Sequence, residues 1–228
     1  MTLRLLDWPW SPYCIKARAI LDYKGLPYTR VHVLGPAYFE LLRRGRAAKV
    51  PALDLDGRLI EDSTEIAYAL ETLAPSPAIL PADPRQRALC HALEDWSDEA
   101  LYWPGLHFQW IDPEGTPLVK AAFGGSVLGT LALPLFRYRV RQQLRGQGTG
   151  RKAPEQIARD LERSLDAIEA LLSPGPWLLG EGPYLCDFAL LGQLLYLSRP
   201  PKSAPMLAAR PNIVAFLARM KAMRPERS

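Results

Sequence analysis

The chain has 228 residues, of which 48% are hydrophobic and 23% are charged, and its formal net charge at pH 7 is +4. This composition is that of an ordinary globular protein with one large or two small domains, and it excludes the disordered and fibrous classes. The weak positive charge gives no argument for a nucleic-acid partner. The one basic run is interpreted as a solvated helix face and loop, and it comprises Arg137, Arg139, Arg141, Arg145, Arg151 and Lys152.

Cysteine and histidine usage indicates the compartment and bears on metal binding. Cys14, Cys90 and Cys186 are widely spaced and define no disulfide framework, which favours a reducing compartment. The three histidines show no metal-ligand spacing, so no metal is expected. Asp7 and Pro9 interrupt the first apolar run, which argues against a secretory signal. We therefore expect a soluble, cytoplasmic protein without a membrane span.

The first helix is predicted over Ser11 to Lys24. Ser11 is a favourable N-cap, Pro12 suits the first helical position, and Gly25 is suited to end the helix. An apolar stripe at helical spacing is made by Cys14, Ala17 and Leu21, whereas Lys16 and Lys24 are expected to reach water.

The rest of the N-terminal part alternates between strand and helix patterns. Asp56-Gly57 between two apolar runs indicates a tight hairpin, because both central residues of such a turn need positive φ. The order β-α-β-α-β-β-α predicts a sheet covered by helices. The expected strands are Leu3 to Trp8, Tyr28 to Val33, Ala52 to Asp54 and Arg58 to Glu61; Asp62 to Leu73 is expected to be a helix, and Ala37 to Arg44 a short helix or an irregular turn.

A proline-rich segment, Ala74 to Pro84, marks the expected domain boundary. We predict an α/β domain over residues 1–75, a linker over 76–84 and an all-helical domain over 85–228. Bent helices and loops are expected between Trp103 and Gly150 because prolines and glycines interrupt the pattern there. The clearer helices are Arg85 to Tyr102, Pro154 to Leu172, Cys186 to Leu197 and Asn212 to Met223.

Three short motifs are candidates for one ligand site, and each also has a purely structural interpretation. Ser11 is either a helix cap or a hydroxyl that holds a thiolate at a helix N-terminus. Cys14, on the apolar stripe, fits a buried thiol better than a nucleophile.

The second motif is Val50-Pro51, at the start of an expected strand. Taken alone, Pro51 indicates an edge proline with a trans bond. If the bond is cis, the N–H and C=O of Val50 are free to pair with an extended peptide ligand. The third motif is Asp62-Ser63, which either caps the next helix with Glu65 or binds a ligand's carboxylate and ammonium groups.

In combination and order, these motifs resemble the N-terminal domain of the glutathione S-transferase superfamily. The resemblance covers essentially the whole chain and implies a thioredoxin-like domain followed by an all-α domain. It implies that glutathione is the co-substrate, with its cysteinyl backbone paired beside Pro51. The implied glutathione contacts are Lys49, Val50, Pro51, Asp62 and Ser63, with Ser11 near the sulfur.

The second half of the chain resembles metaxin-like and failed-axon-like members of the superfamily. Gly146 to Arg151 followed by Ala153 to Ile157, and also Trp110 to Glu114, carry this resemblance. Trp177 to Gly180 and Asp187 to Ala189 resemble the superfamily's helix start. Tyr184 stands where most members have Ser or Thr, which predicts a weakened cap.

The leading functional hypothesis is an enzyme that conjugates glutathione to a small apolar electrophile, with Ser11 as the catalytic hydrogen-bond donor. Tyr13 and Cys14 are possible secondary site residues, and a thiol-reductase role through Cys14 ranks below. The alternative is a non-catalytic, metaxin-like binding or scaffold protein, and the superfamily resemblance also suggests a homodimer. Aromatic residues either fill the core or line the electrophile pocket, for which we select Trp10, Tyr102 and Trp103 from a set that also includes Trp8, Phe108 and Trp110.

Overall fold

The structure is a computed structural model, and it describes residues 1–33, 36–122, 127–180 and 182–223. Its N-terminal part is built on a four-stranded sheet with the strand order β2-β1-β3-β4. Strands β1 (Leu3–Asp7) and β2 (Thr29–His32) run parallel, whereas β3 (Ala52–Leu55) is antiparallel to both β1 and β4 (Arg58–Glu61).

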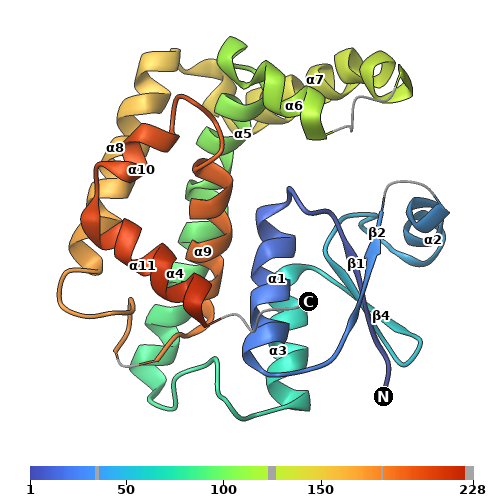
Figure 1. Cartoon of the computed structure of the whole chain (residues 1–228), viewed down its shortest axis with the longest axis vertical. Helices are drawn as coiled ribbons and strands as arrows, with labels where there is room; N and C mark the ends of the chain where they lie inside the picture. The colour runs from blue at the N-terminus through green and yellow to red at the C-terminus, as the bar shows by residue number, and fades with distance from the viewer. Residues whose placement is uncertain (34–35, 123–126, 181, 224–228) are drawn as a thin grey trace.

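Three helices of the described residues complete this part of the molecule. Helices α1 (Pro12–Tyr23) and α3 (Ser63–Leu73) lie between the sheet and the helical part, and α2 (Pro36–Arg44) lies on the opposite side of the sheet (Figure 1). This is the thioredoxin-like arrangement that was expected. The segment for which either a helix or an irregular turn was expected is a helix, α2.

Local sequence signals account for the ends of these elements. The Ser11 side chain caps α1 by accepting a hydrogen bond from the Cys14 N–H, with Pro12 at the first helical position. Gly25, with φ of 63°, follows the helix end. In the β3–β4 hairpin, Asp56 and Gly57 have φ of 47° and 93°, as the two-residue turn requires.

The named elements that the structure describes after the proline-rich segment are all helices, as expected, and one isolated β-bridge joins Trp177 and Gly180. None of the described helices is long and apolar enough to cross a membrane. Helix α7 continues through Pro134. The helices are α4 (Pro84–Ala100), α5 (Tyr102–Trp110), α6 (Thr116–Ala122), α7 (Val127–Gln147), α8 (Pro154–Leu171), α9 (Leu185–Leu197), α10 (Ala204–Ala208) and α11 (Pro211–Ala222), with 3-10 turns η1 (Pro113–Gly115) and η2 (Thr149–Arg151).

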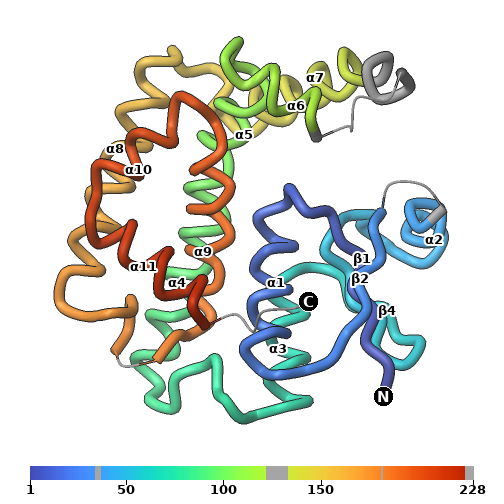
Figure 2. Tube along the Cα trace, in the orientation of Figure 1, coloured from blue at the N-terminus to red at the C-terminus, as the bar shows by residue number. Residues whose placement is uncertain are grey.

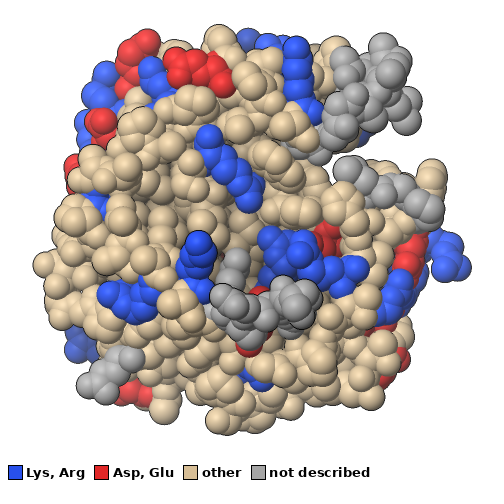
Figure 3. Space-filling model, viewed as in Figure 1, with Lys and Arg blue, Asp and Glu red and all other residues tan. Residues whose placement is uncertain are grey.

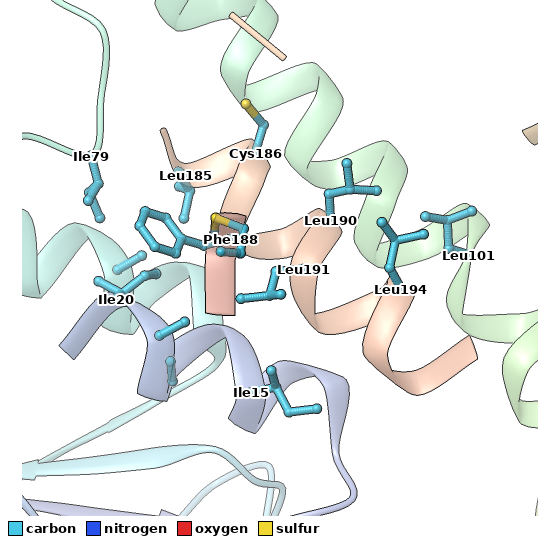
Figure 4. Packing of buried hydrophobic residues seen from close by; sticks show 14 of the residues in the cluster. Ile15, Ile20, Ile79, Leu101, Leu185, Cys186, Phe188, Leu190, Leu191 and Leu194 are labelled. Atoms are coloured by element: carbon cyan, nitrogen blue, oxygen red, sulfur yellow. The ribbon is translucent and has the colours of Figure 1, made fainter. Parts of the chain in front are cut away.

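Helix α9 is the centre of the packing, because it contacts both α1 and α4 (Figure 2). Apolar side chains of α1 and α9 meet in the main hydrophobic core, among them Ile15, Phe188 and Leu191 (Figure 4). Gly192 makes the close approach possible, since a Cβ at this position would lie 2.4 Å from the Pro12 carbonyl oxygen. The N-terminal turn of α1 therefore rests directly on α9.

The start of α9 is held by a buried carboxylate. Asp187 accepts hydrogen bonds from the backbone N–H groups of Leu178 and Tyr184, each at 2.9 Å. Burial raises the pKa of Asp187 to about 6, and these N–H donors oppose the rise. Tyr184, which stands where most members of the superfamily have Ser or Thr, thus contributes its backbone N–H to the cap.

One expectation about α1 is wrong. Lys16 and Lys24 were expected to reach water, but their exposed fractions are 0% and 7%. The reason is that α1 is covered on two sides, by the sheet and by α9, so that it has no wide solvated face. Lys24 donates to the Glu71 carboxylate and to the carbonyl oxygens of Ala74 and Pro77, at 2.6, 2.6 and 2.9 Å, and so ties α1 to the proline-rich segment.

The contact between α1 and α9 gives a stability prediction. Gly192→Ala should lower the free energy of unfolding by about 1–3 kcal/mol, because the added methyl group must push the two helices apart. Gly146→Ala is the matched control, since a Cβ there meets nothing within 4 Å; it should stabilise α7 by about 0.5–1 kcal/mol. Urea unfolding measures both, and equal stabilities of the two variants would contradict this packing.

Candidate functional site

Sheet register brings the three predicted motifs to one end of the sheet. Leu6 of β1 pairs with Ala52 of β3, and Ala52 pairs with Glu61 of β4. The loop to Ser11 leaves β1, Pro51 precedes β3 and Asp62 follows β4, so all three motifs lie at the same end of the sheet. The space-filling view shows that the surface is hollowed near it, between the α6–α7 segment and the α/β part (Figure 3).

Ser11 stands at the start of α1 with 7% of its surface exposed. Its Oγ accepts the hydrogen bond from the Cys14 N–H at 3.3 Å. Accepting this bond occupies a lone pair and leaves the hydroxyl hydrogen available to donate. The structure therefore confirms the capping interpretation, and the geometry is also compatible with donation to an anion at the helix N-terminus.

The Val50-Pro51 peptide bond is cis. No hydrogen bond among the described residues involves the Val50 backbone. Its N–H and C=O thus form a short unpaired strand edge, which suits an extended peptide. Lys49, the residue expected at the glycyl carboxylate, is exposed next to it.

Asp62 is the N-cap of α3. Its carboxylate accepts from the backbone N–H groups of Thr64 at 2.8 Å and Glu65 at 3.4 Å, which confirms the capping interpretation. Ser63 has 3% of its surface exposed. No hydrogen bond among the described residues uses the Ser63 hydroxyl, so it is available to a ligand at this helix N-terminus.

One residue that holds the backbone at this end of the sheet, Glu61, was not predicted from the sequence. The Glu61 carboxylate accepts hydrogen bonds from the N–H groups of Arg46, Ala47 and Ala48, at 2.6, 3.2 and 3.1 Å. It thereby fixes the loop that leads to Lys49. A single acidic residue at the end of a strand carries no sequence signal for this role, because its partners are backbone groups.

Tyr13 and Cys14, the possible secondary residues, are both engaged elsewhere. The Tyr13 hydroxyl donates to the Asp98 carbonyl oxygen at 3.0 Å, and burial raises its pKa above its usual range. Cys14 Sγ is fully buried and accepts from the Trp8 N–H at 3.4 Å. Burial, followed by the Asp7 carboxylate, raises the pKa of Cys14 to about 12, so the thiol stays protonated at neutral pH.

The aromatic residues predicted to line the electrophile pocket belong to two clusters. Tyr102 lies 5.2 Å from the Tyr13 ring and 5.1 Å from the Trp103 ring, measured between centroids. The Arg199 guanidinium lies 4.9 Å from the centroid of the Trp10 ring, and its Nη1 donates to the Trp10 carbonyl oxygen at 3.0 Å. Thus Arg199, just after α9, holds the loop that leads to Ser11.

The other aromatic residues considered have mixed roles. Phe108 and Trp110 are 1% and 4% exposed, as the core interpretation requires. Trp110 nevertheless links Trp8, at 6.5 Å between ring centroids, to Phe136 of α7, at 6.3 Å. Phe136 is 41% exposed, so this row of rings reaches the surface. Trp103 also borders a polar surface hollow together with Gln147 and Asp160.

Comparison with known proteins agrees with this geometry. Models of the glutathione S-transferase N-terminal and C-terminal domains match residues 5–78 and 138–219. An isoprene-epoxide–glutathione S-transferase of Rhodococcus is 27% identical over 92% of this chain and 91% of its own length. A maleylacetoacetate isomerase of Pseudomonas aeruginosa is 30% identical over 76% of this chain and 69% of its own.

A solved structure extends the comparison to three dimensions. A glutathione S-transferase of Methylobacterium radiotolerans, in complex with glutathione sulfonate, superposes with a TM-score of 0.66. The two chains are 25% identical, and the match covers 97% of this chain and 91% of the other. The chain belongs to the glutathione S-transferase family. In the described ranges, no group of three or more His, Cys, Asp or Glu side chains is arranged to hold a metal ion.

Burial of the cysteines gives a prediction about reactivity. Cys14, Cys90 and Cys186 are all 0% exposed. Iodoacetamide at pH 8 should therefore leave the folded protein unmodified over hours and label three thiols after denaturation. Mass spectrometry of the peptides reads the outcome. Rapid labelling of Cys14 in the folded protein would contradict the structure and would favour the thiol-reductase hypothesis.

Proposed function

We propose that this protein is a glutathione transferase that conjugates the thiolate of glutathione to a small apolar electrophile. The observation that carries the proposal is the free backbone of Val50 beside a cis peptide bond, between two helix N-termini that hold Ser11 and Ser63. Glutathione fits this edge as an extended tripeptide. Family membership supports the same co-substrate.

Each part of glutathione has a matching group in this arrangement. The cysteinyl N–H and C=O pair with the Val50 backbone. The γ-glutamyl carboxylate binds at the N-terminus of α3 and to the Ser63 hydroxyl, while the Asp62 carboxylate pairs with the γ-glutamyl ammonium. Lys49 neutralises the glycyl carboxylate.

Ser11 supplies the activation of the thiol. A free thiol has a pKa of about 8.5, so only a few per cent is ionised at pH 7. A hydrogen bond to a charged acceptor contributes about 1.5–3 kcal/mol, and a helix N-terminus about 0.3–1 kcal/mol. Together they lower the pKa of the bound thiol by about 1.5–3 units, because each unit corresponds to about 1.4 kcal/mol. The Ser11 hydroxyl acts as a neutral donor to the thiolate.

The electrophile is placed between the two parts of the molecule. Trp10 is the aromatic residue of the proposed pocket nearest in sequence to Ser11, and Tyr102 and Trp103 come from the facing helix α5. Aromatic rings favour an apolar or aromatic substrate. The proposal also retains a homodimer and a cytoplasmic location, expected from the family resemblance and the cysteine usage.

A non-catalytic, metaxin-like binding or scaffold protein is the alternative. One of the motifs behind that resemblance has a local structural role here. Gln147 Oε1 accepts from the Thr149 N–H at 2.9 Å and from its hydroxyl at 2.7 Å, which shapes the turn between α7 and η2. A Cβ on Gly150 would lie 2.9 Å from the Arg145 nitrogen, so only glycine fits there. This motif therefore serves the fold and gives no specific argument for a scaffold.

The proposal predicts separate losses of binding and turnover. Ser63→Ala should weaken glutathione binding by about 5- to 30-fold, because a hydrogen bond to a carboxylate is lost. Ser11→Ala should lower kcat for an aryl halide by about 10- to 100-fold and raise the pKa in the pH–rate profile by about 1–2 units, with binding little changed. Isothermal titration calorimetry and a conjugation assay measure the two effects.

Ser164→Ala is the matched control, since that hydroxyl donates within α8 to the Asp160 carbonyl oxygen. It should match the wild type in both assays. Glutathione binding without turnover by the wild type would replace the enzyme proposal with the binding-protein alternative. Absence of glutathione binding would overturn the transferase proposal and leave the scaffold alternative.

A further inference from the structure

The interface between the α/β and helical parts contains a buried ionic cluster, the Lys16 cluster, formed by Lys16, Glu94 and Asp98 with Thr64 and Gln193. The exposed fractions of Lys16, Glu94 and Asp98 are 0%, 2% and 8%. Lys16 comes from α1, the two carboxylates from α4, Thr64 from α3 and Gln193 from α9. Four helices of both parts thus meet at one charged group.

All the hydrogen-bond donors of the Lys16 ammonium are used within this cluster. Lys16 Nζ donates to Asp98 Oδ2 at 2.7 Å, to Thr64 Oγ1 at 3.1 Å and to Glu94 Oε1. An ammonium has three N–H donors, and all three find acceptors here. Burial alone would lower the pKa of Lys16, but the Asp98 and Glu94 carboxylates outweigh it and raise the pKa, so the group stays charged.

Thr64 connects this cluster to the proposed glutathione site. Its hydroxyl accepts from Lys16 and donates to Glu94 Oε1, which orients it fully. Its backbone N–H donates to Asp62 Oδ1 at 2.8 Å, and its neighbour in the chain is Ser63. The side chain of Thr64 therefore faces the helical part, while its main chain belongs to the turn that presents Asp62 and Ser63.

The Asp62 backbone explains why such an anchor is needed. Asp62 has φ of 79° and ψ of 134°, a conformation that residues with a side chain rarely adopt. A residue held in such a region is maintained only when its surroundings fix it. Thr64 is the next residue whose side chain is hydrogen-bonded to another element, because no hydrogen bond among the described residues uses the Ser63 hydroxyl.

We infer that the Lys16 cluster, acting through the Thr64 hydroxyl, positions the Asp62–Ser63 turn for the γ-glutamyl group of glutathione. Thr64 is a positioning residue that does not touch the ligand itself. The helical part thereby contributes to the affinity for the tripeptide through its contacts to the Thr64 side chain. This inference rests on the proposed function.

Thr64→Val tests the inference, because valine keeps the shape and leaves Lys16 paired with both carboxylates. The variant should raise the dissociation constant and KM for glutathione by about 5- to 30-fold, with kcat within about two-fold of the wild type. Thr64→Ser retains the hydroxyl and should restore the wild-type affinity. Calorimetry with glutathione and a conjugation assay at saturating glutathione supply these values.

The matched control is Thr72→Val on the same helix, where the hydroxyl donates to the Tyr68 carbonyl oxygen at 3.0 Å and reaches no other element. It should leave the affinity unchanged.

If the wild type binds glutathione and Thr64→Val, folded by circular dichroism, binds it equally well, the inference is overturned while the proposed function stands. A fall in kcat with unchanged affinity would overturn it as well. If Thr64→Val does not fold, unchanged affinity in Thr64→Ala, which also removes the hydroxyl and leaves both carboxylates paired with Lys16, overturns it. Failure of the wild type to bind glutathione would instead refute the proposed function.

Discussion

The buried ammonium of Lys16 is the constraint on which the rest of the structure depends. An unpaired charge at this depth would be too costly to keep, so α4 must present Glu94 and Asp98 to α1 for the chain to fold. Loss of one partner from a buried ion pair destabilises a protein by about 3–5 kcal/mol. The pairing therefore fixes where the helical part docks on α1. That docking in turn sets the close contact between Gly192 and the first turn of α1.

This docking determines the geometry of the proposed site. Ser11 lies at the start of a helix that rests on α9, and Arg199, just after α9, holds the loop before Ser11 through the Trp10 carbonyl oxygen. On the other side, Glu61 fixes the loop before Lys49 through three backbone N–H groups. Each polar group offered to the ligand thus stands on a backbone segment that another element holds, which is the condition for a preorganised site.

The sequence predicted those features that depend on local chemistry. The cap at Ser11, the Asp56-Gly57 hairpin and the cap at Asp62 were all placed correctly, because each depends on a few adjacent residues. The glutathione transferase fold was predicted from the order of the motifs along the chain. The roles of the individual site residues stay predictions.

What the sequence did not predict depends on contacts between distant segments. Lys16 was expected in water because its helix has one apolar stripe, and nothing local indicates that a second surface covers the opposite face. Glu61 was not recognised because its partners are main-chain groups. Pro51 alone could not establish the cis bond, since the isomer is decided by the surrounding tertiary structure. Such features become visible only when the partners from other elements are known.

The central claim is that glutathione lies along Val50 with its sulfur at the Ser11 hydroxyl. A crystal structure of the protein with glutathione tests this most directly. The account predicts hydrogen bonds from the tripeptide backbone to the N–H and C=O of Val50 and a sulfur within about 3.5 Å of Ser11 Oγ. Glutathione bound elsewhere, or bound here with its sulfur directed away from α1, would contradict it.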